Sequence, residues 1–159
     1  MSFEKAMQYL KSAGYEDRVI VPEASSATVE LAAKAIGVEP GRICKTLSFL
    51  VGDQPILILA EGMVKIDNHK YKETFHTKAK MIPGDQVEML IGHAPGGVCP
   101  FGVNPGVQVY LDKSLRKWDT VYPAAGDDHS AVKLSIEELE KISGAQGWID
   151  VCKEVQPCI

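Results

Sequence analysis

The sequence lacks several features that would assign it to a special class of protein. No hydrophobic run approaches the roughly 20 residues of a membrane-spanning helix; the longest, such as Pro55–Ala60, fits a buried strand. The first residues, Met1–Lys5, lack the apolar core of a secretion signal, which predicts a cytoplasmic protein. The four cysteines form neither a CxxC pair nor a zinc-ligand spacing, so we expect reduced structural thiols and no bound metal.

Repeats, linkers and low-complexity stretches are also absent from the 159 residues. A hydrophobic fraction of 45% and a charged fraction of 24% are those of an ordinary globular protein. The length is sufficient for one domain with a sizeable core. We therefore expect a single domain over residues 1–159 and no membrane partner.

The hydrophobic residues follow helical spacing in some segments and alternate in others, which predicts both helices and strands. Because these elements alternate irregularly and include a hairpin, we expect an α+β fold with helices flanking a mixed sheet. The hairpin joins strands 43–51 and 56–60 at Gly52-Asp53, and a capping box of Ser135 and Glu138 begins the last helix, which Gly144 ends. Other helices are predicted over 3–13, from Ser25 or Ser26 to Gly37, over 67–76 and over 85–91, and other strands over 18–21, 107–111, 121–122 and 131–134.

Lys45 interrupts the apolar face of the first hairpin strand. Alternation places it on one face with four apolar side chains, those of Ile43, Leu47, Phe49 and Val51. An unpaired ammonium in an apolar core costs several kcal/mol. Lys45 is therefore either a strand-end lysine that extends its charge to water or a lysine that lines a pocket and holds an anionic or electron-rich substrate group. We favour the pocket.

The segment Gly96–Gly102, with the sequence GGVCPFG, combines three glycines with a proline. Glycines allow backbone N–H groups to approach a ligand closely. The spacing is not that of a phosphate loop or a dinucleotide fingerprint, so we expect no nucleotide cofactor. The loop is either a tight turn or a wall of backbone donors suited to a carbonyl, an oxyanion or an amino-acid head group.

A basic segment runs from Lys65 to Lys80, although the whole chain has a net charge of −4. Five lysines face two carboxylates there, which gives a local charge of +3, and Tyr71 and Phe75 lie among them at helical spacing. Basic and aromatic side chains together are typical of RNA-binding surfaces; the alternative is a solvated helix with aromatics in the core. We favour tRNA contact by Lys65, Lys70, Lys72, Lys78 and Lys80, and Lys113, Arg116 and Lys117 extend this patch if the fold brings them near.

Three segments in this order resemble the YbaK-type aminoacyl-tRNA deacylases, free-standing relatives of the editing domain in bacterial prolyl-tRNA synthetase. They are Gly41–Leu47 (GRICKTL), Gly96–Gly102, and a glycine turn before Ala131–Leu134 (AVKL). The resemblance covers about residues 27–142, and Lys45 and the Gly96-to-Pro100 spacing are its most specific marks. It implies an α+β domain with a curved mixed sheet.

The resemblance also implies an activity and a site. The expected reaction is hydrolysis, without a cofactor, of the ester that joins a wrong small amino acid such as cysteine or alanine to tRNA, usually tRNA for proline. Expected partners are mischarged tRNA and, as a further candidate, prolyl-tRNA synthetase; DNA is not expected. The catalytic residue would be Lys45, and the substrate-binding residues would be Thr46, Gly96, Gly97, Val98, Cys99, Pro100, Gly102, Asp128 and His129.

One departure from the family pattern leaves the amino acid open. The cysteinyl-specific branch usually reads Gly-Gln-Arg-Gly where this chain reads Gly126-Asp127-Asp128-His129. Exchanging arginine for two acids and a histidine changes the charge beside the pocket. Two other functions stay open: a thiol hydrolase with Cys99 as nucleophile and His129 as its base, and a non-catalytic module that binds tRNA or the synthetase.

Overall fold

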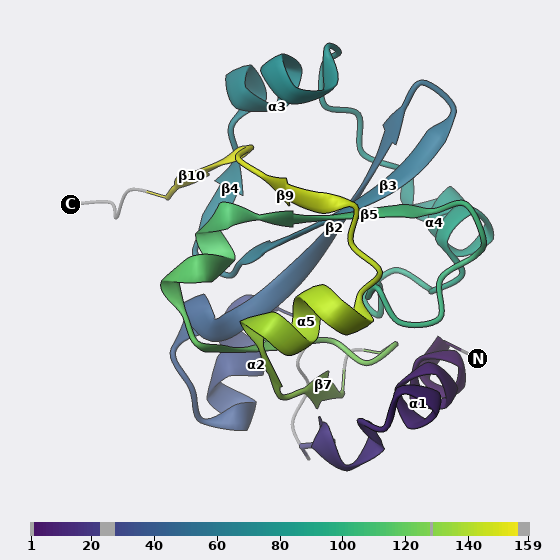
Figure 1. Cartoon of the computed structure of the whole chain (residues 1–159), viewed down its shortest axis with the longest axis vertical. Coiled ribbons are helices and arrows are strands. Elements are labelled where there is room, and N and C mark those ends of the chain that lie inside the picture. Colours follow the sequence, from purple (N-terminus) through teal and green to yellow (C-terminus); the bar gives the residue numbers. More distant parts are fainter. Residues whose placement is uncertain (1, 23–27, 128, 156–159) are drawn as a thin grey trace.

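Six strands form a mixed, curved sheet at the centre of the molecule (Figure 1). The computed structural model describes residues 2–22, 28–127 and 129–155. Within the sheet, β2 and β3 are antiparallel, β6 and β8 are antiparallel, and the other neighbours are parallel. The order across the sheet is β8 (Leu134–Ser135), β6 (Thr120–Pro123), β2 (Ile43–Val51), β3 (Gln54–Glu61), β5 (Gln108–Asp112) and β9 (Gly147–Ile149). The predicted α+β class with a curved mixed sheet is confirmed.

The predicted hairpin is the longest pairing in this sheet. β2 has the predicted bounds, and β3 begins two residues earlier than expected, at Gln54. The turn between them uses Gly52 with a φ of 61°, a conformation that glycine adopts at little cost. The register places Lys45 opposite Ala60 and Thr46 opposite Leu59.

Two short antiparallel pairs lie outside the main sheet. β1 (Val19–Ile20) pairs with β7 (Ala131–Val132), and β4 (Val64–Ile66) pairs with β10 (Cys152–Glu154). The expected strand over 131–134 is thus divided between β7 and β8. The second pair brings the end of the described chain beside the segment that follows β3, as Figure 1 shows.

Five helices surround the strands in the described ranges: α1 (Ser2–Ala13), α2 (Val29–Ile36), α3 (Asn68–Phe75), α4 (Gly84–Ile91) and α5 (Ile136–Ile142). Thr28 caps α2 by accepting a hydrogen bond from the Leu31 N–H, whereas Ser25 and Ser26 lie outside the described residues. The predicted capping box of Ser135 and Glu138 is present at α5. Short 3-10 turns cover Glu16–Arg18, Pro40–Arg42 and Lys113–Lys117. Among the described residues, no helix has both the length and the apolar character needed to cross a membrane.

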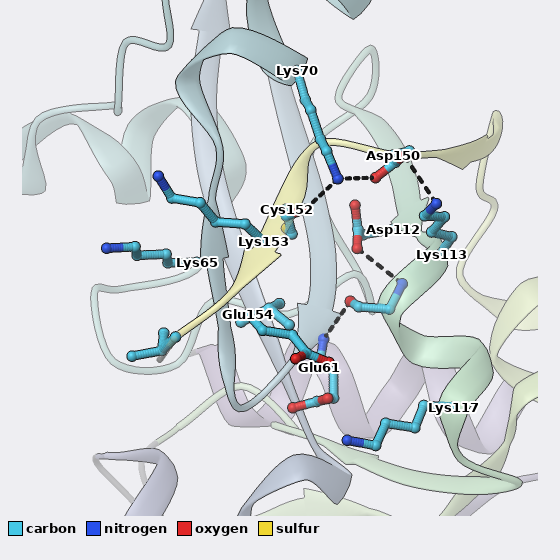
Figure 2. Close-up of a pocket in the computed structure, with 13 residues that line it drawn as sticks. Glu61, Lys65, Lys70, Asp112, Lys113, Lys117, Asp150, Cys152, Lys153 and Glu154 are labelled. Atoms are coloured by element: carbon cyan, nitrogen blue, oxygen red, sulfur yellow. Dashed lines mark hydrogen bonds and ion pairs between the residues drawn. The ribbon is translucent and has the colours of Figure 1, made fainter. Parts of the chain in front are cut away.

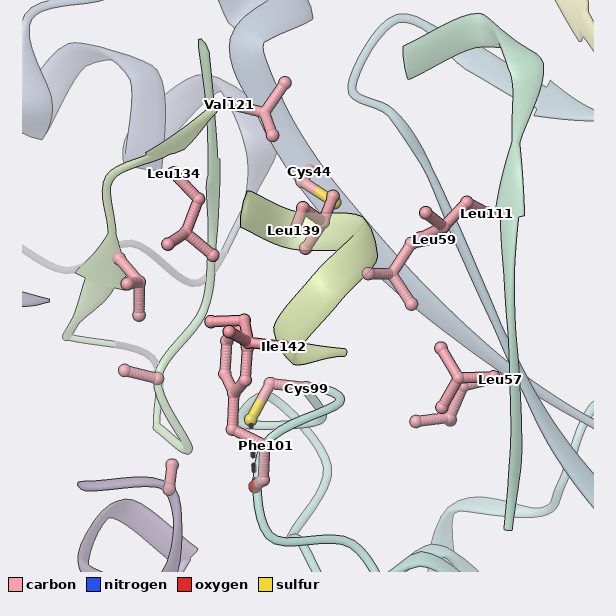
Figure 3. Packing of buried hydrophobic residues seen from close by; sticks show 14 of the residues in the cluster. Cys44, Leu57, Leu59, Cys99, Phe101, Leu111, Val121, Leu134, Leu139 and Ile142 are labelled. Carbon is pink, nitrogen blue, oxygen red and sulfur yellow. Dashed lines mark hydrogen bonds between the residues drawn. The ribbon is translucent and has the colours of Figure 1, made fainter. Parts of the chain in front are cut away.

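Both faces of the central sheet are buried. Leu57 and Leu59 of β3 belong to the core that α5 covers, to which that helix contributes Leu139 and Ile142 (Figure 3). The alternate residues Ile56 and Ile58 belong to a second core, under α3, which also holds Phe49, Tyr71 and Val151. A strand buried on both faces reads as a continuous apolar run, and burying each such side chain contributes roughly 1.5–3 kcal/mol. The run Pro55–Ala60 therefore specifies the centre of the fold.

Candidate functional site

A cleft of about 440 Å³ opens at the edge of β2. Its walls come from the start of α2, from the segment before α4, from the glycine-rich loop and from the end of β6. Among its lining residues are Thr28, Val29, Ala32, Lys45, Thr46, Ser48, Met81, Ile82, Val87, Gly96, Val98, Tyr122, Ala124 and Ser130. The fold thus brings together residues that are up to about 100 positions apart in the chain.

The cleft exists because the neighbours of β2 leave a gap. On one side of the gap, β6 pairs with β2 only at Ile43 and Cys44. On the other side, the Ile82 N–H donates to the Ser48 carbonyl at 3.1 Å, and the Leu50 N–H donates to the Lys80 carbonyl at 2.9 Å. These bonds show that even-numbered residues of β2 direct their backbone groups to this edge, since alternate residues of an antiparallel strand face opposite neighbours.

Thr46 lies in this gap, between Cys44 and Ser48. Its backbone N–H and C=O therefore point to a stretch of edge that no strand or bridge covers in the described part of the chain. Its Oγ1 is buried and has no hydrogen-bond partner among the described residues. A buried polar atom without a partner costs about 1–3 kcal/mol, so the site holds hydrogen-bonding groups that a ligand would satisfy.

Lys45 also lines the cleft, although its neighbour Thr46 faces the other side of the strand. The half-buried Lys45 Nζ donates to the carbonyl oxygen of Val64 and, at 3.5 Å, to that of Gly62. Burial lowers the pKa of the ammonium, and the nearby Cys152 and Glu61 oppose this shift. Carbonyl partners satisfy N–H groups without neutralising the charge, so the ammonium retains its attraction for an anion.

The side chains that β2 directs into the cleft are small and polar. Cys44, Thr46 and Ser48 alternate along one face of the strand, and all three line the cleft. Ser130 adds a hydroxyl from the opposite wall, where it donates to Asp127 Oδ1 at 2.6 Å. This floor leaves room for a small ligand and presents hydrogen-bonding groups to it.

The glycine-rich loop reaches the cleft with only part of its length. Gly96 and Val98 line the cleft, but Gly97 is buried and donates its N–H to the Ala94 carbonyl at 3.0 Å. A Cβ at Gly97 would lie 2.2 Å from the carbonyl oxygen of Gly126, and one at Gly102 would lie 2.8 Å from that of Lys5. The expectation of a wall of available donors is therefore wrong for Gly97, because close packing and a local turn use this glycine.

Cys99 and Pro100 are buried behind the cleft and do not line it. The Cys99 Sγ lies 3.6 Å from Nε2 of His93, which is 2.6 Å from the Phe101 carbonyl. Burial raises the pKa of the Cys99 thiol to about 12, and hydrogen bonds with the backbone of Phe101 and Gly126 oppose this shift. The structure contradicts the thiol-hydrolase hypothesis, because such a thiol is not ionised at neutral pH and His129 is exposed while Cys99 is not.

The turn after Gly126 borders the cleft through Ser130. Asp127 Oδ1 accepts hydrogen bonds from the Ser130 hydroxyl and, at 2.9 Å, from the His129 N–H. The expected contact residue His129 has an exposed side chain and does not line the cleft. Asp128, the other expected contact, lies outside the described residues. Asp127 is thus the acid that organises this turn.

Only two of the five predicted tRNA-binding lysines line the same hollow. Lys65 and Lys70 line a second hollow, where Lys113 and Lys117 join them (Figure 2). Lys72, Lys78 and Lys80 are exposed and do not line it. Arg116 stacks its guanidinium 4.2 Å from the centre of the Trp148 ring instead. In the described ranges, no three His, Cys, Asp or Glu side chains are grouped as metal ligands would be.

Sequence reasoning missed three contributors to these sites. Ser48 and Ser130 were not expected in the cleft, and Lys153 was not expected beside Lys65. The small polar residues at alternate positions of strand 43–51 were a usable signal for the cleft floor. No local signal marked Lys153, because its place depends on a pairing between distant segments.

Comparisons with known proteins agree with this architecture. A family model described as an aminoacyl-tRNA editing domain matches residues 23–142. "Uncharacterized protein YwhH" of Bacillus subtilis (strain 168) is 47% identical over 155 residues, which cover 97% of this chain and 99% of that protein. "Putative Cys-tRNA(Pro)/Cys-tRNA(Cys) deacylase EbsC" of Enterococcus faecalis (strain ATCC 700802 / V583) is 26% identical over 122 residues, covering 75% and 74% of the two chains. A crystal structure of "a putative trans-editing enzyme for prolyl tRNA synthetase" superposes with a TM-score of 0.86 at 29% identity, covering 96% of this chain and 97% of the other.

Proposed function

This chain belongs to the aminoacyl-tRNA editing domain family, and we propose that it is a trans-editing hydrolase that removes a small, wrongly attached amino acid from tRNA. Its tRNA is the one for proline, its further partner is prolyl-tRNA synthetase, and it acts in the cytoplasm, where tRNA is charged. The whole of residues 1–159 makes up this one editing domain. The names of EbsC and of the crystallised trans-editing enzyme support the substrate.

The observation that carries the proposal is the uncovered edge of Thr46 beside the Lys45 ammonium. Ester hydrolysis requires a held carbonyl group, a water molecule and donors for the negative charge on the carbonyl oxygen. We assign this role to the Thr46 N–H on the uncovered edge, and one such donor contributes about 10²–10³ in rate. Lys45 holds the terminal phosphate or ribose and so orients the ester.

The reaction needs no nucleophile from the protein. Water adds to the ester carbonyl carbon, the bond from that carbon to the ribose oxygen breaks, and a proton from the water ends on that ribose oxygen. A hydroxyl of the terminal ribose, or the substrate's own side chain, assists the water. The products are the free amino acid and uncharged tRNA.

The cleft is large enough to hold the aminoacyl group at the end of a tRNA. A volume of about 440 Å³ is at the low end of the range for ligand sites. A synthetase discriminates against one missing methylene by only about 1–3 kcal/mol. A second site that excludes the correct amino acid supplies the rest of the discrimination, and cysteine, alanine or serine fits such a site.

The test is a panel of tRNAs for proline, each charged with proline, alanine, cysteine or serine, together with cysteine on its own tRNA. We expect at least one small amino acid to be released about tenfold faster than proline, or more. Tenfold is the lower limit of the discrimination that one methylene group provides. Release from all five charged tRNAs at the buffer rate contradicts hydrolysis. In that case, tight binding of the same tRNAs would identify a non-catalytic binding module.

A further inference from the structure

The second hollow, of about 1020 Å³, is larger than the cleft and is lined by several lysines. Five lysines from different parts of the chain line it: Lys65, Lys70, Lys113, Lys117 and Lys153, here called the lysine basin. Figure 2 shows Lys70, Lys113 and Lys117 on the side of β10 where Asp112 lies, whereas Lys65 and Lys153 extend together from the β4–β10 pair toward the outside. They come from α3, β4, β10 and the 3-10 turn Lys113–Lys117.

Lys65 and Lys153 stand directly opposite each other in the β4–β10 pair. Like charges at directly opposite positions of antiparallel strands destabilise the pairing. Both side chains are exposed, so neither is part of a core that would require it. A bound anion would offset this repulsion.

The carboxylates of the basin are largely engaged with the protein. Asp112 is buried and accepts hydrogen bonds from the N–H groups of Val151 and Ser114, at 2.8 and 2.9 Å. Glu61 is also buried and accepts from the Met63 N–H at 2.5 Å.

The two other carboxylates lie closer to the rim. Asp150 pairs with both Lys70 and Lys113, at 3.1 and 3.0 Å. Glu154 is exposed on β10. Lys65, Lys117 and Lys153 therefore present positive charge that no ion pair among the described residues neutralises.

The basin and the cleft share a wall. Lys45, which lines the cleft, donates to the Val64 carbonyl, and Val64 lines the basin. Glu61, also of the basin, is close enough to affect the pKa of Lys45. The basin therefore adjoins the cleft on the far side of the contact between Lys45 and Val64.

We propose that the lysine basin binds the phosphodiester groups of the single-stranded 3′ end of tRNA, upstream of the terminal nucleotide. This inference rests on the proposed function, since it takes the aminoacyl end to lie in the cleft. Successive phosphates of the RNA strand contact the exposed lysines Lys65, Lys117 and Lys153, whereas a free phosphate ion would contact only one or two of them.

The test compares two double variants that remove the same charge. Lys65→Gln with Lys153→Gln alters the basin, and Lys11→Gln with Lys141→Gln alters exposed lysines on α1 and α5. The dissociation constant of uncharged tRNA is measured over a salt series, together with the melting temperature of each variant. Binding of uncharged tRNA involves no turnover, so this readout does not depend on the hydrolytic activity proposed above.

We expect the basin variant to bind tRNA about tenfold more weakly. The slope of log affinity against log salt concentration should be shallower by about 1.4, because each of two lost single-strand phosphate contacts accounts for about 0.7. The melting temperature of this variant should be unchanged or higher, because the repulsion between the two lysines is removed. The α1–α5 variant should match the wild type. The proposal is overturned if the basin variant keeps the wild-type dissociation constant and salt dependence. It is also overturned if the basin variant and the α1–α5 variant change by the same amount.

A second RNA tests the assignment to the 3′ end. Transfer RNA shortened by its single-stranded 3′ nucleotides should bind the wild type and the basin variant equally. If the shortened RNA still distinguishes the two proteins, the basin binds another part of the RNA and the proposal is wrong.

Discussion

Lys45 and Thr46 are adjacent in β2 and line the same cleft, although their side chains leave opposite faces of the strand. This is possible because β2 has an uncovered edge at Thr46, around which both faces of the strand meet the cleft. One residue contributes a charge and the other contributes hydrogen-bonding groups without partners in the described residues. The edge gap is therefore the structural basis of the proposed site.

The Thr46 hydroxyl should matter to activity more than to stability. Because its Oγ1 has no partner within the described residues, Thr46→Val should raise the free energy of unfolding by about 1 kcal/mol or leave it unchanged. The same change should lower kcat/KM by roughly tenfold, on the scale of one hydrogen bond. Thr46→Ser keeps the hydroxyl and serves as the control. Equal activity of the valine and wild-type proteins would show that the hydroxyl does not contact substrate.

Cys99 should prove to be a structural residue. Its thiol is fully buried beside His93, and burial raises its pKa to about 12. Cys99→Ala should retain turnover at saturating tRNA while losing about 1–2 kcal/mol of stability through a small cavity. Turnover is measured beside urea unfolding. Abolished turnover in a stable variant, with an acyl-enzyme detected by mass spectrometry in the wild type, would restore the thiol mechanism.

Gly96 and Gly97 should respond differently to alanine. At Gly97 the new Cβ would lie 2.2 Å from the Gly126 carbonyl oxygen, so Gly97→Ala should lower the melting temperature strongly and activity with it. At Gly96 no atom lies within 4 Å of the added Cβ, and the strain of a φ of 91° should cost about 1–2 kcal/mol. Thermal melting of both variants tests this order. Equal melting temperatures would contradict the packing of the loop against the Gly126 turn.

The lowered pKa of Lys45 predicts a pH dependence of stability. Between this lowered pKa and the unfolded value of about 10.4, the unfolded chain binds more protons at this position than the native chain does. The free energy of unfolding of the wild type, minus that of Lys45→Met, should therefore rise with pH in that window and be constant below it. Urea unfolding of both proteins over an alkaline pH series measures the difference. A constant difference across the window would show that Lys45 titrates normally.

The elements that the sequence predicted well are those with strong local signals. Alternation gave the bounds of β2, and the Ser135–Glu138 pair predicted the capping box of α5. Lys45 was singled out because a lysine among apolar residues on one strand face is rare, and it does line the cleft. The short strands β4, β9 and β10 were missed because three residues carry too little periodic signal.

The sites depend on pairings between distant segments, which no local pattern encodes. The gap at Thr46 arises because β6 and the Lys80–Ile82 segment stop short of each other along β2. The Lys65–Lys153 contact requires β10 to return to β4. The role expected of Gly97 failed for the same reason, since the Gly126 turn that packs on it lies far along the chain.

Turnover of Lys45→Ala at saturating mischarged tRNA is the measurement that tests the central claim most directly, with Lys133→Ala, an exposed lysine outside the cleft, as the matched control. Lys45→Ala should reduce turnover by about 10²-fold or more, the scale of the loss when the reacting group is misplaced by about 1 Å. Its melting temperature should stay within a few degrees of the wild type, since two carbonyl hydrogen bonds are lost while a half-buried charge is removed. Lys133→Ala should match the wild type in both respects. Near-wild-type turnover by Lys45→Ala would contradict the placement of the hydrolytic site in this cleft.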